Sequence, residues 1–333
     1  MVACNRIGWV DALRGFAIFL VVMGHLIQMR WWPDGFVIKE YIYSFHMPLF
    51  MLISGFFAKK GINIVSQREL KEYIQKKAFQ LLVPFSVFGL FFLLVHRWSN
   101  VWNNYILLGG REYWFLWVLF QCFVWVALCA FLYDIASKRL GLPLWGKWLC
   151  LMLPLLIIQQ SGGTLASILS KENFLYNYPF FILGIALSVY PELLKVAVNK
   201  RIGVLSLCIY VSLMQLPSFS GIEYLRAVCA IQLLITVFHS FIDFRSLETA
   251  GRYSLEIYLM HYYLCYLVPH STFGTIRKYI LCNQILFGGY VVDIQLIVII
   301  AVCSIIIVAM CVSLARMMLR YDLIRKYCFG KKL

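Results

Sequence analysis

Apolar residues occupy most of the chain in long runs, and short polar or basic segments separate these runs. A membrane-spanning helix needs about 20 predominantly apolar residues, and the runs are about 15 to 25 residues long. The expected fold class is therefore all-α, a polytopic membrane helix bundle that forms a single integral-membrane domain over residues 1–333. About ten spans are predicted, at residues 10–29, 38–57, 78–95, 113–135, 145–159, 174–190, 202–216, 224–242, 254–268 and 289–315.

The charge of the connecting segments predicts the orientation of these spans. With the N-terminus in the cytoplasm, the inner segments hold 21 Lys and Arg and the outer segments hold 7. Cytoplasmic loops of membrane proteins carry such an excess of basic residues. The expected location is the inner (plasma) membrane, with multiple passes and two short cytoplasmic termini. The formal net charge of +15 is then explained by inner loops that contact anionic membrane lipids, and no nucleic-acid partner is expected.

Composition supports the membrane class. The chain is 62% hydrophobic and 14% charged, with a mean hydropathy of +0.80, whereas a soluble domain is about a quarter charged. We expect the first run to be retained, because it is too long for a signal-peptide core and lacks a cleavage site. The eleven cysteines form no CxxC pair, so neither a metal site nor a disulfide framework is expected.

The first run carries two ionisable side chains on one helical face. Arg14 and His25 are eleven residues apart, which in an α-helix is three turns plus about 20° and about 16 Å along the axis. Ionisable groups in a membrane span are costly and usually have a function or a partner. His25 is suited to accept a proton from a hydroxyl or to bond a neighbouring helix. Arg14 is suited to bind an anion or to pair with Asp11.

Other polar side chains interrupt the later runs. In the second run, His46 precedes Pro48, and Ser54 precedes a glycine that allows close helix approach. Trp117 opens the fourth run, where it suits an interfacial belt or stacking on a sugar. The ninth run holds His261 at mid-membrane depth. The further candidates for substrate binding are His46, Ser54, Trp117, Glu256 and His261, and each also has a purely structural interpretation, such as an Arg252–Glu256 ion pair.

Lys76 and Lys77 end the most basic connection, which leads into the third run as an amphipathic or extended helix. Lipid anchoring and docking of a phosphorylated ligand are both compatible with this pattern. Signatures of soluble hydrolases, P-loop enzymes, Rossmann domains and zinc proteases are absent from the sequence.

Five segments resemble one family in order along the chain. The segment WVDALRGFAIFLVVMGH is similar to the opening of the acyltransferase family 3 membrane proteins, with their Arg-x10-His pattern at Arg14 and His25. The other four resemblances lie in FHMPLFMLISGFF, QKKAFQLLVPF, YWFLWVLF and GRYSLEIYLMH. The chain also resembles the short stand-alone members of this family, including the fucose 4-O-acetylase-like branch.

The resemblance implies an O-acyltransferase that moves an acyl group, acetyl by default, from cytoplasmic acyl-CoA to a hydroxyl of a carbohydrate or lipid-linked glycan. His25 would be the catalytic base. Arg14, Lys76 and Lys77 would attract the anionic donor, with acetyl-CoA as a substrate and no permanently bound cofactor. Acyl transfer needs such a base, an oxyanion stabiliser and a thioester held nearby.

Two other functions stay open at this point. A ten-span bundle with ionisable groups at mid-membrane depth also suits a proton-coupled carrier or a glycan transporter. A non-catalytic partner in surface-polysaccharide assembly would tolerate substitution of Arg14 and His25. The sequence leaves the acceptor open, and a homo-oligomer is compatible with it.

Overall fold

The computed structural model describes residues 7–28, 37–96, 112–217, 219–241, 245–267, 285–287, 290–292 and 294–331. Both predicted cytoplasmic ends, residues 1–6 and 332–333, lie outside the described residues. So do five of the seven basic residues of the predicted outer segments, which are Arg30, Arg97, Arg111, Arg277 and Lys278.

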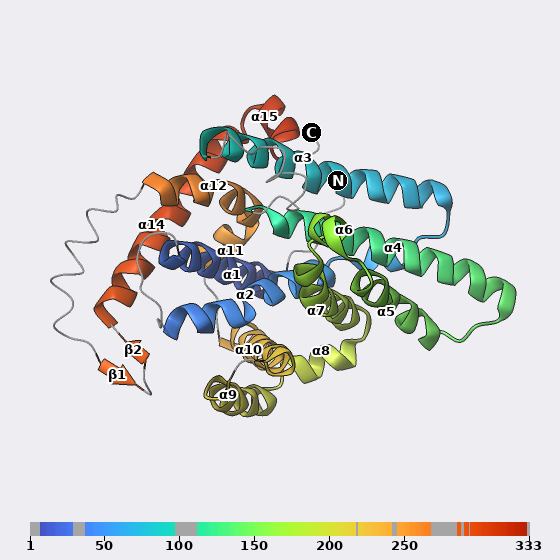
Figure 1. Cartoon of the computed structure of the whole chain (residues 1–333), viewed down its shortest axis with the longest axis horizontal. Coiled ribbons are helices and arrows are strands. Elements are labelled where there is room, and N and C mark those ends of the chain that lie inside the picture. Colours follow the sequence, from blue (N-terminus) through green and yellow to red (C-terminus); the bar gives the residue numbers. More distant parts are fainter. Residues whose placement is uncertain are drawn as a thin grey trace. The chain divides into compact units, whose positions relative to one another are not determined.

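Helices make up almost all of the described chain (Figure 1), which confirms the predicted all-helical membrane class. All ten apolar runs contain a helix. These helices are α1 (Gly8–Leu26), α2 (Val37–Phe56), α3 (Gln67–His96), α4 (Trp114–Leu140), α5 (Trp145–Gln159), α7 (Lys171–Val189), α9 (Lys200–Met214), α10 (Ser220–Phe241), α12 (Ser254–Leu267) and α14 (Ile294–Met318).

Shorter elements that the apolar pattern does not predict connect these helices. Two antiparallel strands, β1 and β2, pair Ile285 with Val292, so the tenth run begins as a strand and becomes helical at Ile294. The short elements of the described residues are η2 (Lys59–Ile62), α6 (Gly163–Ile168), α8 (Pro191–Ala197), α11 (Arg245–Arg252), β1 (Ile285–Phe287), β2 (Tyr290–Val292) and α15 (Asp322–Tyr327).

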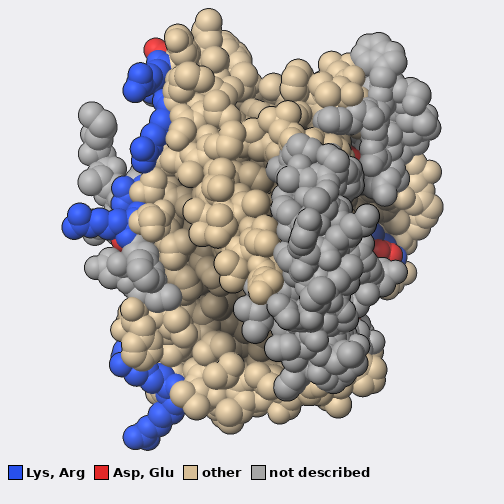
Figure 2. All heavy atoms as spheres, turned by 90° about the vertical axis from the view of Figure 1, so that its left-hand side faces the viewer, with Lys and Arg blue, Asp and Glu red and all other residues tan. Residues whose placement is uncertain are grey.

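Five helices of the described chain are long and apolar enough to cross a membrane, namely α1, α3, α4, α10 and α14. The number rises to six if α7 and α8, which meet at a bend of 111°, are one broken span. The full count of ten spans stays a prediction. In Figure 2, Lys and Arg side chains gather along the left-hand edge, and the tan middle of the described face shows no charged side chains, as expected of a surface that contacts lipid.

The chain divides into two compact units, which are described separately. Unit 1 comprises Met1–Phe50 and Lys195–Met317, and unit 2 comprises Met51–Leu194 and Met318–Leu333. In unit 1, α1 packs against α10, α11 and α12, and α9 packs against α10. In unit 2, α4 packs against η2, α3, α5 and α7. The expectation of a single domain over residues 1–333 stays a prediction.

Glycines allow the closest helix contacts in unit 2. A Cβ atom added to Gly55 in α2 would collide with the carbonyl oxygen of Phe181 in α7, and one added to Gly184 would collide with that of Leu52. The two backbones therefore touch, as small residues permit between membrane helices. This contact confirms the close helix approach predicted at Gly55.

The start of α3 follows from a local capping pattern. The Oγ atom of Ser66 accepts a hydrogen bond of 3.2 Å from the backbone N–H of Glu69, and the carboxylate of Glu69 accepts one of 3.3 Å from that of Val65. A Ser followed three residues later by Glu satisfies backbone donors that a helix start would otherwise leave unpaired. The basic connection therefore continues as a helix into the third span, as predicted.

Candidate functional site

In unit 1, α1 and α12 bring three aromatic polar side chains together. The Oη atom of Tyr262 lies 3.2 Å from Nε2 of His25, and the centroids of these two rings are 4.6 Å apart. The ring of His261 lies 5.2 Å from that of His25 and 4.5 Å from that of Tyr262. Since His25 comes from α1 and the other two from α12, the packing of these helices creates the group. We call His25, His261 and Tyr262 the imidazole cluster.

His261 has a defined tautomer. Its side chain is fully buried, and Nδ1 lies 3.1 Å from the carbonyl oxygen of Ile257, one turn earlier in α12. A carbonyl oxygen accepts hydrogen bonds and cannot donate them, so Nδ1 carries the proton and Nε2 keeps a lone pair. Within the described part of the chain, this buried Nε2 atom has no hydrogen-bond partner. It can therefore accept a hydrogen bond or a proton from a bound hydroxyl.

His46 is the third imidazole of this region. It is buried in α2, where its Nδ1 atom lies 2.7 Å from the carbonyl oxygen of Ile42. Its ring meets that of Tyr43 edge-on at 4.9 Å, and Tyr43 donates a hydrogen bond of 2.7 Å to Gln28. His46 also interacts electrostatically with His25. The structure thus brings together the two histidines that the sequence places at a similar membrane depth.

Arg14 lies in a set of charged groups on α1 and α11. It interacts electrostatically with Asp11, whose carboxylate is also 3.9 Å from Nε of Arg252. Arg252 in turn donates to Glu248, at 2.9 Å, one turn earlier in α11. The structure therefore pairs Arg252 with Glu248 and Asp11, where the sequence suggested Glu256. Glu256 is fully buried in the first turn of α12, where the helix dipole favours a carboxylate.

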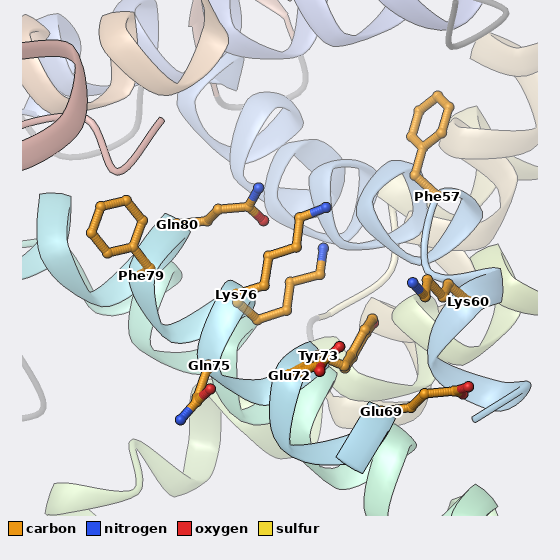
Figure 3. A pocket seen from close by; sticks show the side chains of 10 residues that line it. Phe57, Lys60, Glu69, Glu72, Tyr73, Gln75, Lys76, Phe79 and Gln80 are labelled. Atoms are coloured by element: carbon orange, nitrogen blue, oxygen red, sulfur yellow. The ribbon is translucent and has the colours of Figure 1, made fainter. Parts of the chain in front are cut away.

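Unit 2 contains a hollow of about 660 Å³ beside α3. The side chains of Lys60 from η2 and Lys76 from α3 project toward the same open space, and Phe57 and Gln80 flank it (Figure 3). Lys77 also lines the hollow, and its Nζ atom lies 3.7 Å from the ring centroid of Phe123. We call this hollow, which is lined by three lysines, the basic pocket.

The two carboxylates of the basic pocket have other partners. Glu72 accepts a hydrogen bond of 2.9 Å from Nε of Arg68. Glu69 accepts a hydrogen bond from Val65 at the start of α3. The lining therefore holds three lysines and two carboxylates, one of which is paired with Arg68, so its balance of charge is positive.

Trp117 and Ser54 also belong to unit 2. The indole Nε1 of Trp117 donates a hydrogen bond of 2.8 Å to the carbonyl oxygen of Ile168, and its ring stacks on Phe85 at 6.1 Å. Trp117 therefore links α4 to α6 and α3. Ser54 is half-buried in α2, next to the Gly55 contact.

The predicted site residues thus divide between the units. Unit 1 contains Arg14, His25, His46, Glu256 and His261, whereas unit 2 contains Ser54, Lys76, Lys77 and Trp117. Sequence reasoning missed the hydrogen bond between Tyr262 and His25. The one available signal was that Tyr262 follows His261 in a run otherwise composed largely of apolar residues.

Comparison with known proteins identifies the family to which the chain is similar. The model of acyltransferase family 3, described as an acyltransferase domain, matches residues 7–316. Nodulation protein NolL of Sinorhizobium fredii is 31% identical over 199 residues, which cover 55% of this chain and 49% of the relative. Nodulation protein NolL of Mesorhizobium japonicum is 30% identical over 197 residues, which cover 54% and 47%.

The chain spans about half the length of these two relatives. No solved structure matches the chain. The family match covers nearly all of the described helices, including those that carry the imidazole cluster and the basic pocket. The chain therefore belongs to acyltransferase family 3, as a multi-pass membrane protein.

Proposed function

We propose that this protein is a membrane O-acyltransferase that moves an acyl group, acetyl by default, from acyl-CoA to a hydroxyl of a carbohydrate or cell-surface glycan. The observation that carries the proposal is the imidazole cluster, in which His25 contacts Tyr262 and lies beside the unpartnered Nε2 atom of His261. Acyl transfer to a hydroxyl needs a positioned proton acceptor in a water-poor site, and this cluster offers one within a membrane bundle.

His25 is the general base of the proposed reaction. The acceptor oxygen attacks the thioester carbonyl as its proton moves to His25, the carbon–sulfur bond breaks, and the proton passes to the sulfur of the departing CoA. The products are the acylated carbohydrate and free CoA. A positioned general base typically contributes about 10²- to 10⁴-fold to such a rate.

His261 is the proposed contact for a second hydroxyl of the acceptor, beside the attacking one. Its Nε2 lone pair is held in a dry environment, where an unpaired polar atom costs free energy until a donor binds. His46 and Glu256 supply further buried polar groups in the same unit. Ser54 and Trp117 are proposed contacts for other parts of the acceptor.

The donor phosphates are assigned to the basic pocket, through Lys76 and Lys77. Lys60 adds a third cation at the same hollow, whose volume of about 660 Å³ is in the usual range for a nucleotide-sized ligand. Arg14 is assigned to the donor as well, or to the oxyanion that forms on the thioester carbonyl. No permanently bound cofactor is needed for this chemistry.

The remaining proposals concern the cellular setting. The excess of basic residues in the predicted inner loops supports insertion in the plasma membrane with both termini in the cytoplasm, where acyl-CoA is available. Membership of the fucose 4-O-acetylase-like branch is also part of the proposal, and it rests on the resemblance in sequence alone.

Product analysis tests the proposed function. Purified protein in lipid nanodiscs is given acetyl-CoA labelled in the acetyl group, with a panel of oligosaccharide acceptors. We expect free CoA and acetylated acceptor to appear in equal amounts, and no CoA release without acceptor beyond slow hydrolysis. Accumulation of the carbohydrate inside proteoliposomes without CoA release would instead identify a carrier and contradict the proposal.

A further inference from the structure

The imidazoles of His25, His46 and His261 in unit 1 differ in how their ring nitrogens are bonded. His46 and His261 both place Nδ1 against the carbonyl oxygen of the residue four positions earlier in the helix, at 2.7 and 3.1 Å. His25 does not follow this pattern. Its hydrogen bond within the described part of the chain is made by Nε2, to the Oη atom of Tyr262 on another helix.

These contacts fix the position of the lone pair in two of the three rings. In His46 and His261 the carbonyl oxygen requires a proton on Nδ1, so Nε2 keeps the lone pair. The partner of His25 is a phenol hydroxyl, which can either donate or accept a hydrogen bond. When Nε2 of His25 donates to Tyr262, the lone pair lies on Nδ1, which no backbone carbonyl of the described residues engages.

We propose that Tyr262 is a positioning residue that holds His25 in the tautomer protonated at Nε2, so that Nδ1 is the atom that takes the proton from the acceptor hydroxyl. This inference rests on the proposed function, since it names the reacting atom of the proposed base. Nothing in the family match or in the two relatives' names assigns a role to Tyr262.

The surroundings of Tyr262 make this hydrogen bond hard to replace. The side chain is 7% exposed, and its ring packs at 4.6 Å on His25 and at 4.5 Å on His261. Water has little access to the bond, so His25 would lose its Nε2 partner when the hydroxyl is removed. The other titratable groups that interact with His25 are the imidazoles of His46 and His261.

The proton balance of the step follows from this tautomer. In the resting site, His25 is neutral, with a proton on Nε2 that is donated to Tyr262. When the acceptor oxygen attacks, its proton moves to Nδ1 and the ring becomes an imidazolium with both nitrogens protonated. Tyr262 still accepts from Nε2 and stabilises this cation. Transfer of the Nδ1 proton to the sulfur of CoA restores the starting tautomer.

The kinetic test compares Tyr262→Phe with Tyr263→Phe, a matched change at the next position of α12. Removing the hydroxyl of Tyr262 is expected to lower kcat by about 10- to 100-fold, a part of the full effect of a general base. The KM for acetyl-CoA should change by less than about twofold, since the donor phosphates are assigned elsewhere. Tyr263→Phe should retain kcat within about twofold, since Tyr263 does not belong to the imidazole cluster.

The histidine tautomer is measured directly on protein labelled with ¹⁵N-histidine, with His25→Gln used to assign the signals. In the wild type, we expect His25 to show a protonated Nε2 and an unprotonated Nδ1, and in Tyr262→Phe a mixture of tautomers. A wild-type His25 protonated at Nδ1 would overturn the inference.

A double-mutant cycle separates this inference from the proposed function. If Tyr262 acts through His25, adding Tyr262→Phe to His25→Gln should lower kcat by no more than about twofold further. An inactive His25→Gln with a fully active Tyr262→Phe would reject the role of Tyr262 and leave the proposed function intact. A fully active His25→Gln would reject the proposed base itself.

Discussion

Gly15 in α1 and Gly251 in α11 meet backbone to backbone. A Cβ atom added to Gly15 would lie 3.0 Å from the nitrogen of Gly251, and one added to Gly251 would lie 3.1 Å from that of Gly15. Each added atom would also collide with a carbonyl oxygen of the opposite helix, that of Leu247 or Asp11. This crossing positions α1, the helix that carries both Arg14 and His25.

The crossing predicts that neither glycine tolerates a side chain. Gly15→Ala and Gly251→Ala should each destabilise the folded protein by about 1 to 3 kcal/mol, because forcing extra atoms into a packed contact shifts the backbone. Thermal unfolding in detergent measures the effect. Gly162→Ala is the control, since an added Cβ at Gly162 would have no atom within 4 Å. Equal melting temperatures for the Gly15 and Gly162 variants would show that α1 and α11 do not cross as described.

Lys76 and Lys77 should act on donor affinity and not on the chemical step. Lys76→Gln and Lys77→Gln are each expected to raise the KM for acetyl-CoA by about 3- to 10-fold, because each removes one charge from the site proposed for the phosphates. The kcat should stay within about twofold. Steady-state kinetics at two salt concentrations also tests the charge effect, since the wild-type KM should rise with ionic strength more than that of the double variant.

Lys71→Gln is the matched control for this experiment. Lys71 is an exposed lysine of the same helix that does not line the basic pocket. If its KM rises as much as that of Lys76→Gln, the effect comes from the general basic charge of the connection, and the basic pocket is not the donor site.

Lys147 should stabilise unit 2 by bridging α4 and η2. Its Nζ atom donates hydrogen bonds of 2.7 Å both to the carboxylate of Asp134 in α4 and to the carbonyl oxygen of Ile62 in η2. Lys147→Met should lower the free energy of unfolding by about 1 to 3 kcal/mol, since both acceptors lose a charged donor. Lys138→Met, at an exposed lysine near the end of α4, is the control for thermal unfolding. A Lys147→Met variant as stable as this control would contradict the stabilising role of Lys147.

Much of this fold was predictable, because long apolar runs dictate helices in a membrane. Each of the ten runs contains a helix, and the basic segment before the third run begins α3 at Gln67 as expected. The short helices were not predictable from hydropathy. For example, α11, with the sequence RSLETAGR, is polar over most of its length and forms in contact with α1.

The candidate site was predictable in part. The shared face of Arg14 and His25 was predictable, because it follows from the periodicity of the single helix α1. Which helix faces His25 depends on contacts between distant segments, such as the glycine crossing of α1 and α11, and spacing along the chain does not contain that information. Tyr262 is 237 positions from His25 in the sequence, so their hydrogen bond emerges only from the packed structure.

The most direct test of the central claim is the rate of acceptor-dependent CoA release by His25→Ala in folded, membrane-inserted protein. We expect a loss of kcat of at least about 100-fold, since the proposed general base is removed, with a KM for acetyl-CoA and a melting temperature close to those of the wild type. Acylation of the acceptor at the wild-type rate by His25→Ala would contradict the central claim.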